Sequence, residues 1–142
     1  MRRWEHWAEW KSLKNLKIET LQITIALEPM AWKRVRAGRG VFFKDRASRA
    51  YANMLGYEFA KAKMAAAWNP AKAAWLECIF YRSTYRRIDN DNLIKIVQDA
   101  GNKILWLDDA QLVHTAQDKK YDKANPRTEI TVRYGQPWGA KS

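Results

Sequence analysis

The spacing of apolar residues changes from one segment of this chain to the next, and the order of these changes restricts the fold. Apolar and polar residues alternate over residues 21–27, which predicts a half-buried strand. Residues 46–67 have helical spacing, and residues 74–81 form an apolar run typical of a second strand. Asp91 or Asn92 is expected to cap a further helix. The apolar face of that helix comprises Leu93, Ile96, Val97, Ala100 and Ile104.

The two ends of the chain add further elements. Residues 111–121 and 127–134 predict two closing strands, joined as a hairpin around residues 124–126. Tryptophans recur every third position over residues 3–14, which predicts a short amphipathic helix. Its tryptophan stripe is expected to pack on the domain or on a second subunit, and a stacking platform for nucleic acid is the alternative. The resulting order, α-β-β-α-β-α-β-β, predicts an α+β domain. Its helices should cover one face of a mixed, largely antiparallel sheet.

Two expectations concern the core. Cys78 is the only cysteine, so no intrachain disulfide can form, and its apolar surroundings in sequence favour a small core residue over a nucleophile. The helix at 46–67 is rich in alanine, which leaves its buried face open to several assignments. The face we expect comprises Ala50, Met54, Tyr57 or Leu55, Ala60 or Lys61, and Met64.

The length of 142 residues fits one domain. We expect an amphipathic extension at 1–18, a folded domain at 19–134 and a flexible tail at 135–142. No stretch approaches the roughly 20 apolar residues of a membrane-spanning helix, and no apolar signal-peptide core follows the basic N-terminus. These features predict a cytoplasmic protein without a membrane partner.

The net charge of +11 is large for so small a domain and favours a polyanionic partner, with nucleic acid ahead of a membrane surface. Many of the positive charges lie in one glycine-containing segment, residues 33–49, with interleaved aromatic residues. Such a segment suits phosphate contacts and base stacking. A solvated loop with Phe42 and Phe43 in the core is the alternative. The residues expected to contact nucleic acid are Lys33, Arg34, Arg36, Arg39, Lys44 and Arg46, with Arg86 and Arg87 further along.

Four aspartates flank the helix that follows residue 91. Asp89 and Asp91 lie before it, and Asp108 and Asp109 lie just past its far end. Clustered carboxylates repel one another, by roughly 4 kcal/mol per pair at 4 Å and an effective dielectric of 20, and a divalent cation turns this repulsion into attraction. Oxygen ligands without a histidine or cysteine set favour Mg²⁺ or Mn²⁺ over Zn²⁺. Such an ion supports phosphodiester hydrolysis.

Lys95 follows Asp91 by one helical turn, so both can face one side, where the lysine could neutralise a scissile phosphate. The helix separates the two acidic pairs by roughly 22 Å if it has about fifteen residues. Asp109 therefore reaches Asp91 only if the chain turns back along the helix or a second subunit supplies it.

Each of these residues also has a purely structural interpretation. In this interpretation Asp91 is a helix cap and binds no metal, and Asp89 forms an ion pair with Arg86 or Arg87. The two aspartates after the helix can form a simple turn, and Lys95 can be a solvated helix lysine. A short D-x-D motif does not decide between these alternatives.

A longer string is more specific. Residues 87–95, RIDNDNLIK, are followed by residues 106–113, WLDDAQLV. This pattern resembles the RusA family of Holliday junction resolvases, whose signature is a basic stretch, D-x-D-N-L-x-K, a helix and W-x-D-D-x-Q. The resemblance is specific over residues 86–113 and looser on both sides. The turn after the first strand, at residues 28–32, departs from the family pattern.

The resemblance implies a homodimer of mixed α/β fold, encoded by a bacterium or bacteriophage, that makes two symmetric nicks in four-way or other branched DNA. It implies dependence on Mg²⁺, for which Mn²⁺ substitutes. Carried over by position, Asp89, Asp91 and Asp109 are the metal-binding carboxylates and Lys95 is the catalytic lysine. Asp108 is a candidate accessory residue beside them.

Two other function classes remain open from the residues alone. A basic DNA-binding module without catalysis would explain the charge and the aromatic residues, but acidic clusters facing phosphates would weaken its binding. A metal-dependent nuclease for flaps, single strands, RNA or other branched substrates would use the same carboxylates.

Overall fold

The computed structural model describes residues 19–36, 42–88 and 90–135, and for residues 34–36, 42, 43, 90 and 91 it describes the backbone alone. The predicted N-terminal helix, Arg39, Asp89 and the tail beyond residue 135 lie outside the described residues. Within the described ranges, no helix is both long and apolar enough to cross a membrane.

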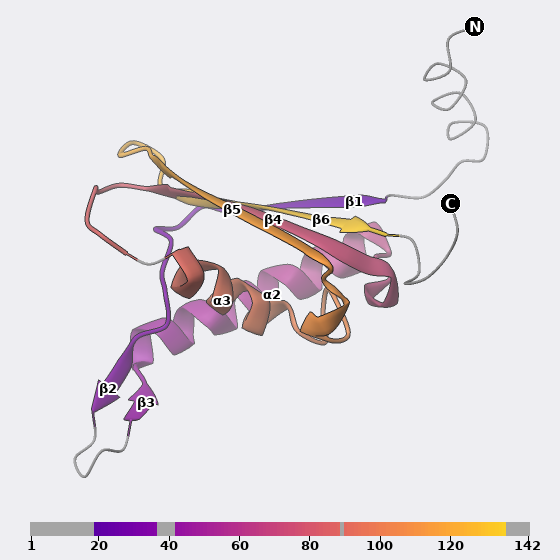
Figure 1. The fold of residues 1–142 in the computed structure, drawn as a ribbon, viewed down its shortest axis with the longest axis horizontal. Coiled ribbons are helices and arrows are strands. Elements are labelled where there is room, and N and C mark those ends of the chain that lie inside the picture. Colours follow the sequence, from indigo (N-terminus) through magenta and orange to yellow (C-terminus); the bar gives the residue numbers. More distant parts are fainter. Residues whose placement is uncertain (1–18, 37–41, 89, 136–142) are drawn as a thin grey trace, which may run out of the picture.

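Four strands form one mixed sheet in the order β1-β6-β4-β5 (Figure 1). β6 pairs antiparallel with both β1 and β4, whereas β5 pairs parallel with β4. The α+β class and the mixed, largely antiparallel sheet are therefore confirmed. The strands are β1 (Thr20–Ile25), β4 (Ala73–Arg82), β5 (His114–Tyr121) and β6 (Arg127–Tyr134).

The predicted closing hairpin is wrong, because β4 lies between β5 and β6. β6 alternates buried Thr128, Ile130 and Val132 with more exposed residues, which suits a strand paired on both sides. β5 has the sequence HTAQDKKY, whose polar residues suit the edge of the sheet, where one side of the strand meets water.

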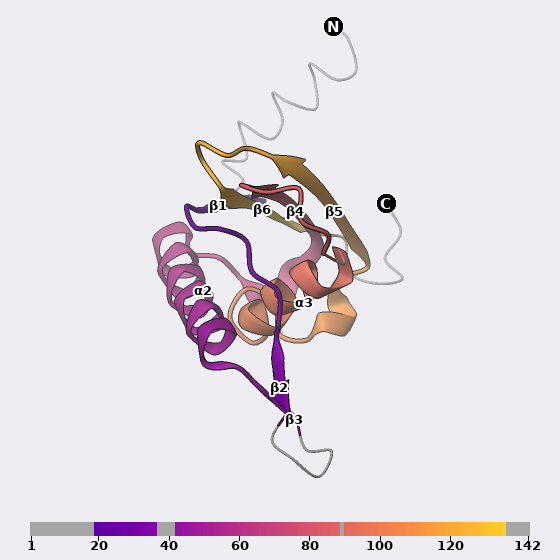
Figure 2. The same ribbon diagram turned by 90° about the vertical axis from the view of Figure 1, so that its left-hand side faces the viewer.

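Two helices, α2 (Arg46–Ala66) and α3 (Asn90–Gly101), cover the same face of the sheet (Figure 2). Leu93, Ile96 and Val97 of α3 are fully buried, as the sequence predicts. Cys78 is 1 % exposed, which confirms it as a core residue, and burial raises the pKa of its thiol. Two short 3₁₀ helices, η1 (Pro70–Lys72) and η2 (Asp109–Gln111), complete the described helices.

The buried face of α2 differs from the predicted one. Ser48, Tyr51, Leu55 and Phe59 are buried, whereas Tyr57 is 64 % and Met64 83 % exposed. Both sets have helical spacing, but burying Tyr51 and Phe59 removes more apolar surface from water than burying alanines would. Asp45 caps the helix by accepting a hydrogen bond from the Ser48 amide at 2.8 Å. This contact with Ser48 lowers the pKa of the Asp45 carboxyl.

The basic segment after β1 is a short hairpin, where the sequence predicted a loop. β2 (Arg34–Arg36) pairs antiparallel with β3 (Phe42–Lys44), and both views show this hairpin standing away from the sheet (Figures 1 and 2). Trp32, just before β2, donates from Nε1 to Asp99 Oδ2 of α3 at 2.7 Å. Lys44 Nζ lies 3.9 Å from the same oxygen and 3.9 Å from the Trp32 ring centroid. The hairpin is thus joined at its base to α3.

Candidate active site

The chain leaves α3 through a tight turn in which Trp106 packs back on the last helical residue. Trp106 is fully buried, and a Cβ atom on Gly101 would lie only 2.5 Å from its ring. The Leu105 amide donates to Gly101 O at 2.8 Å and holds the turn closed. Glycine at position 101 therefore leaves the space that the indole needs.

The buried indole orients Asp109. Trp106 Nε1 donates to Asp109 Oδ1 at 2.7 Å, and the aspartate is half-buried. Among the described residues nothing donates a hydrogen bond to the second carboxylate oxygen, Oδ2. One oxygen is thus held by the protein, and the other has no donor among the described residues. An oriented carboxylate of this kind fits a hard divalent cation.

Asp108 and Gln111 stabilise the short helix η2, to which Asp109 belongs. Asp108 Oδ1 accepts from the Ala110 amide at 3.2 Å, and Gln111 Oε1 accepts from the amides of Asp108 and Leu107 at 3.1 and 3.0 Å. Gln111 Nε2 donates to the carbonyls of Pro70 and Ala73 at 2.6 and 2.9 Å. Sequence reasoning assigned no role to Gln111, although it belongs to the same short motif. In the structure it ties η2 to the start of β4.

The first half of the acidic signature lies at the other end of α3. The helix begins at Asn90, so Asp91 and Asn92 lie in its first turn and neither is the cap that the sequence predicted. Asp89 falls outside the described residues. Lys95 lies one turn further along, is exposed, and has no hydrogen bond or ion pair with any described residue. Its ammonium group is therefore available to an anion.

The helix length separates the two halves within one chain. Asp91 and Gly101 are ten residues apart, about 15 Å along a helix axis. Figure 1 shows η2, in orange, at the opposite end of α3 from its first turn. The chain beyond Trp106 therefore does not turn back along the helix. In the described part of the chain, no three His, Cys, Asp or Glu residues are grouped so that they could hold a metal ion.

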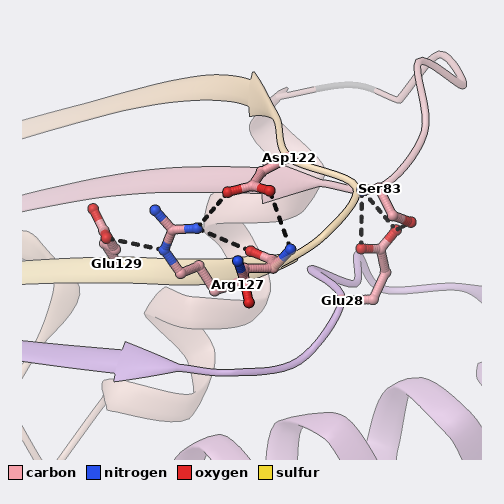
Figure 3. A network of polar contacts seen from close by, with 6 residues as sticks. Glu28, Ser83, Asp122, Arg127 and Glu129 are labelled. Atoms are coloured by element: carbon pink, nitrogen blue, oxygen red, sulfur yellow. Dashed lines mark hydrogen bonds and ion pairs between the residues drawn. The ribbon is translucent and has the colours of Figure 1, made fainter.

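The segment that leads into α3 is anchored at both ends. Ser83 Oγ donates to Glu28 Oε1 at 2.6 Å, where the chain leaves β4 (Figure 3). Lys119 Nζ donates to Ile88 O at 2.7 Å, one residue before Asp89. Arg86 and Arg87 lie between these anchors and are exposed. The segment therefore presents two cations beside the start of α3.

The comparison with known families identifies the chain. The family model for the endodeoxyribonuclease RusA matches residues 26–133, which is most of the chain and includes both halves of the acidic signature. The chain belongs to the RusA family. The RusA-like fold is confirmed with it, and no curated protein matches the sequence. RusA enzymes are Holliday junction resolvases, so this chain is an enzyme, a DNA phosphodiester hydrolase.

The described basic residues expected to contact DNA lie beside the β2–β3 hairpin and in the segment that leads into α3. Lys33 and Arg46 are exposed beside the β2–β3 hairpin, and Lys44 is also partly exposed while it contacts Asp99. The side chains of Arg34 and Arg36 and the whole of Arg39 lie outside the described part. Figure 1 shows the hairpin, the start of α3 and the segment 83–88 at one end of the molecule. A DNA strand at this end would meet cations from three elements.

Proposed function

We propose that this RusA-family enzyme is a Mg²⁺-dependent resolvase that cuts four-way DNA junctions by paired symmetric nicks, in DNA recombination and repair in the cytoplasm of a bacterium or of a phage-infected cell. Family membership and the complete acidic signature support this proposal. The observation that carries it furthest is Asp109, which Trp106 holds through one oxygen while no described residue donates to the other.

In this proposal Asp89, Asp91 and Asp109 hold a Mg²⁺ ion, and Mn²⁺ can take its place. A divalent ion supplies a polarised phosphoryl oxygen and an attacking water of lowered pKa. The chain's own residues do the rest. Lys95 offsets the charge that builds up on the scissile phosphate, and Trp106 fixes the direction of the Asp109 carboxylate. Arg86 and Arg87 contact the phosphates beside the cut.

The enzyme acts as a homodimer in this proposal, and each metal site combines Asp89 and Asp91 of one protomer with Asp109 of its partner. The support is the separation of the two halves at opposite ends of α3. A dimer also matches the substrate, because two symmetric nicks in a four-way junction require two sites related by a two-fold axis.

Cleavage of a labelled synthetic four-way junction tests the proposal, with a matching linear duplex and a flap alongside, in Mg²⁺, Mn²⁺ and EDTA. Paired symmetric nicks should occur in the junction alone and should disappear in EDTA. Equal cutting of flap or duplex would remove junction selectivity and leave a general metal-dependent nuclease. Tight binding without cutting in either metal, on junctions of varied sequence, would contradict the catalytic proposal and favour a binding module.

Asp91→Asn is the matched variant for this experiment. It should abolish cleavage and leave junction binding in EDTA intact, because the carboxylate serves the metal and not the phosphates. The metal-free protein should be as stable as the wild type or more so, since charge repulsion is relieved. A clear loss of metal-free stability, measured by urea unfolding, would instead show that Asp91 matters for the first turn of α3.

A further inference from the structure

Two exposed tyrosines stack on each other beside the start of α3. The ring centroids of Tyr85 and Tyr121 lie 4.1 Å apart with an interplanar angle of 18°. Tyr85 is nevertheless 82 % exposed and Tyr121 44 % exposed. A pair that served only to fill the core would be covered, so the free ring surface needs another explanation. Tyr85 is the outer ring, and Tyr121 supports it from β5.

Both rings are held by anchored backbone. Tyr85 follows Ser83, whose amide and hydroxyl both donate to Glu28 (Figure 3). Tyr121 precedes Asp122, whose amide donates to Arg82 O at 2.8 Å and whose carboxylate pairs with Arg127 at 2.9 Å. Arg127 also donates to Glu129 at 3.1 Å, so the whole turn is fixed (Figure 3). The two rings are therefore oriented before any ligand arrives, which lowers the entropy cost of binding.

The residues that flank the pair in sequence include several cations, and the carboxylate of Glu28 is engaged by Ser83. Arg86 and Arg87 follow Tyr85 directly and are exposed, and Lys119 lies two residues before Tyr121 on the same face of β5. The negative charge of Asp122 is offset by Arg127. Asp118 pairs with Ile79, so it faces the other side of the sheet. A flat aromatic surface edged by cations suits a nucleobase with its phosphates, because every base has a π-face and each phosphate is an anion.

We propose that Tyr85 and Tyr121 form a stacking platform for a nucleobase that is unstacked at the branch point of the DNA. The inference rests on the proposed function, because branched DNA presents bases that lack a stacking neighbour on one side. Tyr85 lies within the segment that leads to Asp89, so a base stacked on it would place its strand next to the cations at Arg86 and Arg87. Stacking of this kind needs no particular base, and it adds affinity for branch points over duplex DNA.

A thermodynamic cycle between the ring and the base tests the platform. Affinities are measured in EDTA for a four-way junction and for junctions with one abasic nucleotide at each branch-point position in turn, using wild type and Tyr85→Ala. The affinity of wild type should fall about 5- to 150-fold when the abasic nucleotide occupies one or more of the branch-point positions, the range expected for one stacked base. Tyr85→Ala should bind the intact junction more weakly by a similar factor and lose nothing further when that base is removed. Tyr85→Phe keeps the ring and should behave as wild type.

Tyr57→Ala is the control, because Tyr57 is also an exposed tyrosine but lies on α2. Tyr57→Ala should bind the intact junction and the abasic junctions with the same affinities as wild type. The platform is overturned if wild type binds all abasic junctions equally, or if Tyr85→Ala loses as much as wild type when the base is removed. It is also overturned if Tyr85→Ala turns a dimer into a monomer on gel filtration, since the pair would then be an interface between copies. Should Tyr85→Ala fold poorly, Tyr121→Ala enters the same cycle.

Failure of the platform and failure of the proposed function are separable. If wild type cuts an unmodified junction in Mg²⁺ but the cycle shows no coupling, the platform alone is wrong. If wild type cuts no junction, the proposed function fails, while the cycle in EDTA still reports on the tyrosines.

Discussion

At the scale of single residues, the motif W-x-D-D-x-Q divides into Asp109, the carboxylate that we propose binds the metal, and three side chains that hold the turn around it. Trp106 donates to Asp109, Asp108 caps η2, and Gln111 joins the short helix to the start of β4. Asp108 thus has a structural contact in the described chain, and its accessory role stays a prediction. The spacing of these residues in the sequence could not assign the different roles, because neighbouring residues in a turn point in different directions.

Trp106→Phe should raise the Mg²⁺ requirement, because an aromatic ring is kept while the donor to Asp109 is lost. Loss of a group that orients a metal ligand typically costs 10–100-fold in metal affinity. Metal titration of cleavage and direct Mn²⁺ binding both measure this shift. Trp68→Phe is the control: Trp68 is equally buried, but its Nε1 donates to Leu105 O at 2.8 Å, a backbone carbonyl. Equal shifts in the two variants would show a general loss of packing and no specific orientation of Asp109.

At the scale of elements, the sequence predicted the strands and helices better than their partners. Every described strand of the sheet overlaps a predicted segment, because period-two alternation and apolar runs are local features. The pairing of β5 with β4, and not with β6, depends on which strand takes a central position in the sheet. That choice is a property of the whole sheet and not of one segment. The buried face of α2 was predicted correctly only at Leu55, one of the alternatives, since several faces of an alanine-rich helix share the same spacing.

Gly101→Ala should destabilise the end of α3, although alanine is the better helix former. The added Cβ would lie 2.5 and 2.6 Å from two carbons of the Trp106 ring, so the indole must move. Such overpacking costs about 1–3 kcal/mol. Gly56→Ala is the matched control in α2, where the Cβ would meet only Ile104 Cδ1 at 3.8 Å, and it should stabilise by up to about 1 kcal/mol. Urea unfolding midpoints measure both, and a stabilised Gly101→Ala would show that Trp106 has room to shift.

At the scale of the whole molecule, the sequence predicts three metal-binding carboxylates but does not say how they would come together. The distance between them is set by α3, whose length of twelve residues the pattern approximates, and by the direction of the chain after it, which the pattern does not contain. Trp106 determines that direction by packing on Gly101. Asp109 therefore stays at the far end of the helix, which is why we propose that a second protomer supplies the third carboxylate.

A mixture of two inactive variants distinguishes a shared site from a site within one chain. Asp91→Asn and Asp109→Asn should each be inactive alone. If each site takes Asp91 from one protomer and Asp109 from the other, a mixed dimer contains one site with both mutations and one intact site. Mixing the variants after unfolding and refolding should then restore nicking of a single strand per junction. If each site lies within one chain, both sites of the mixed dimer carry a mutation. No activity would return on mixing, and the single-strand nicks measured on a labelled junction would be absent.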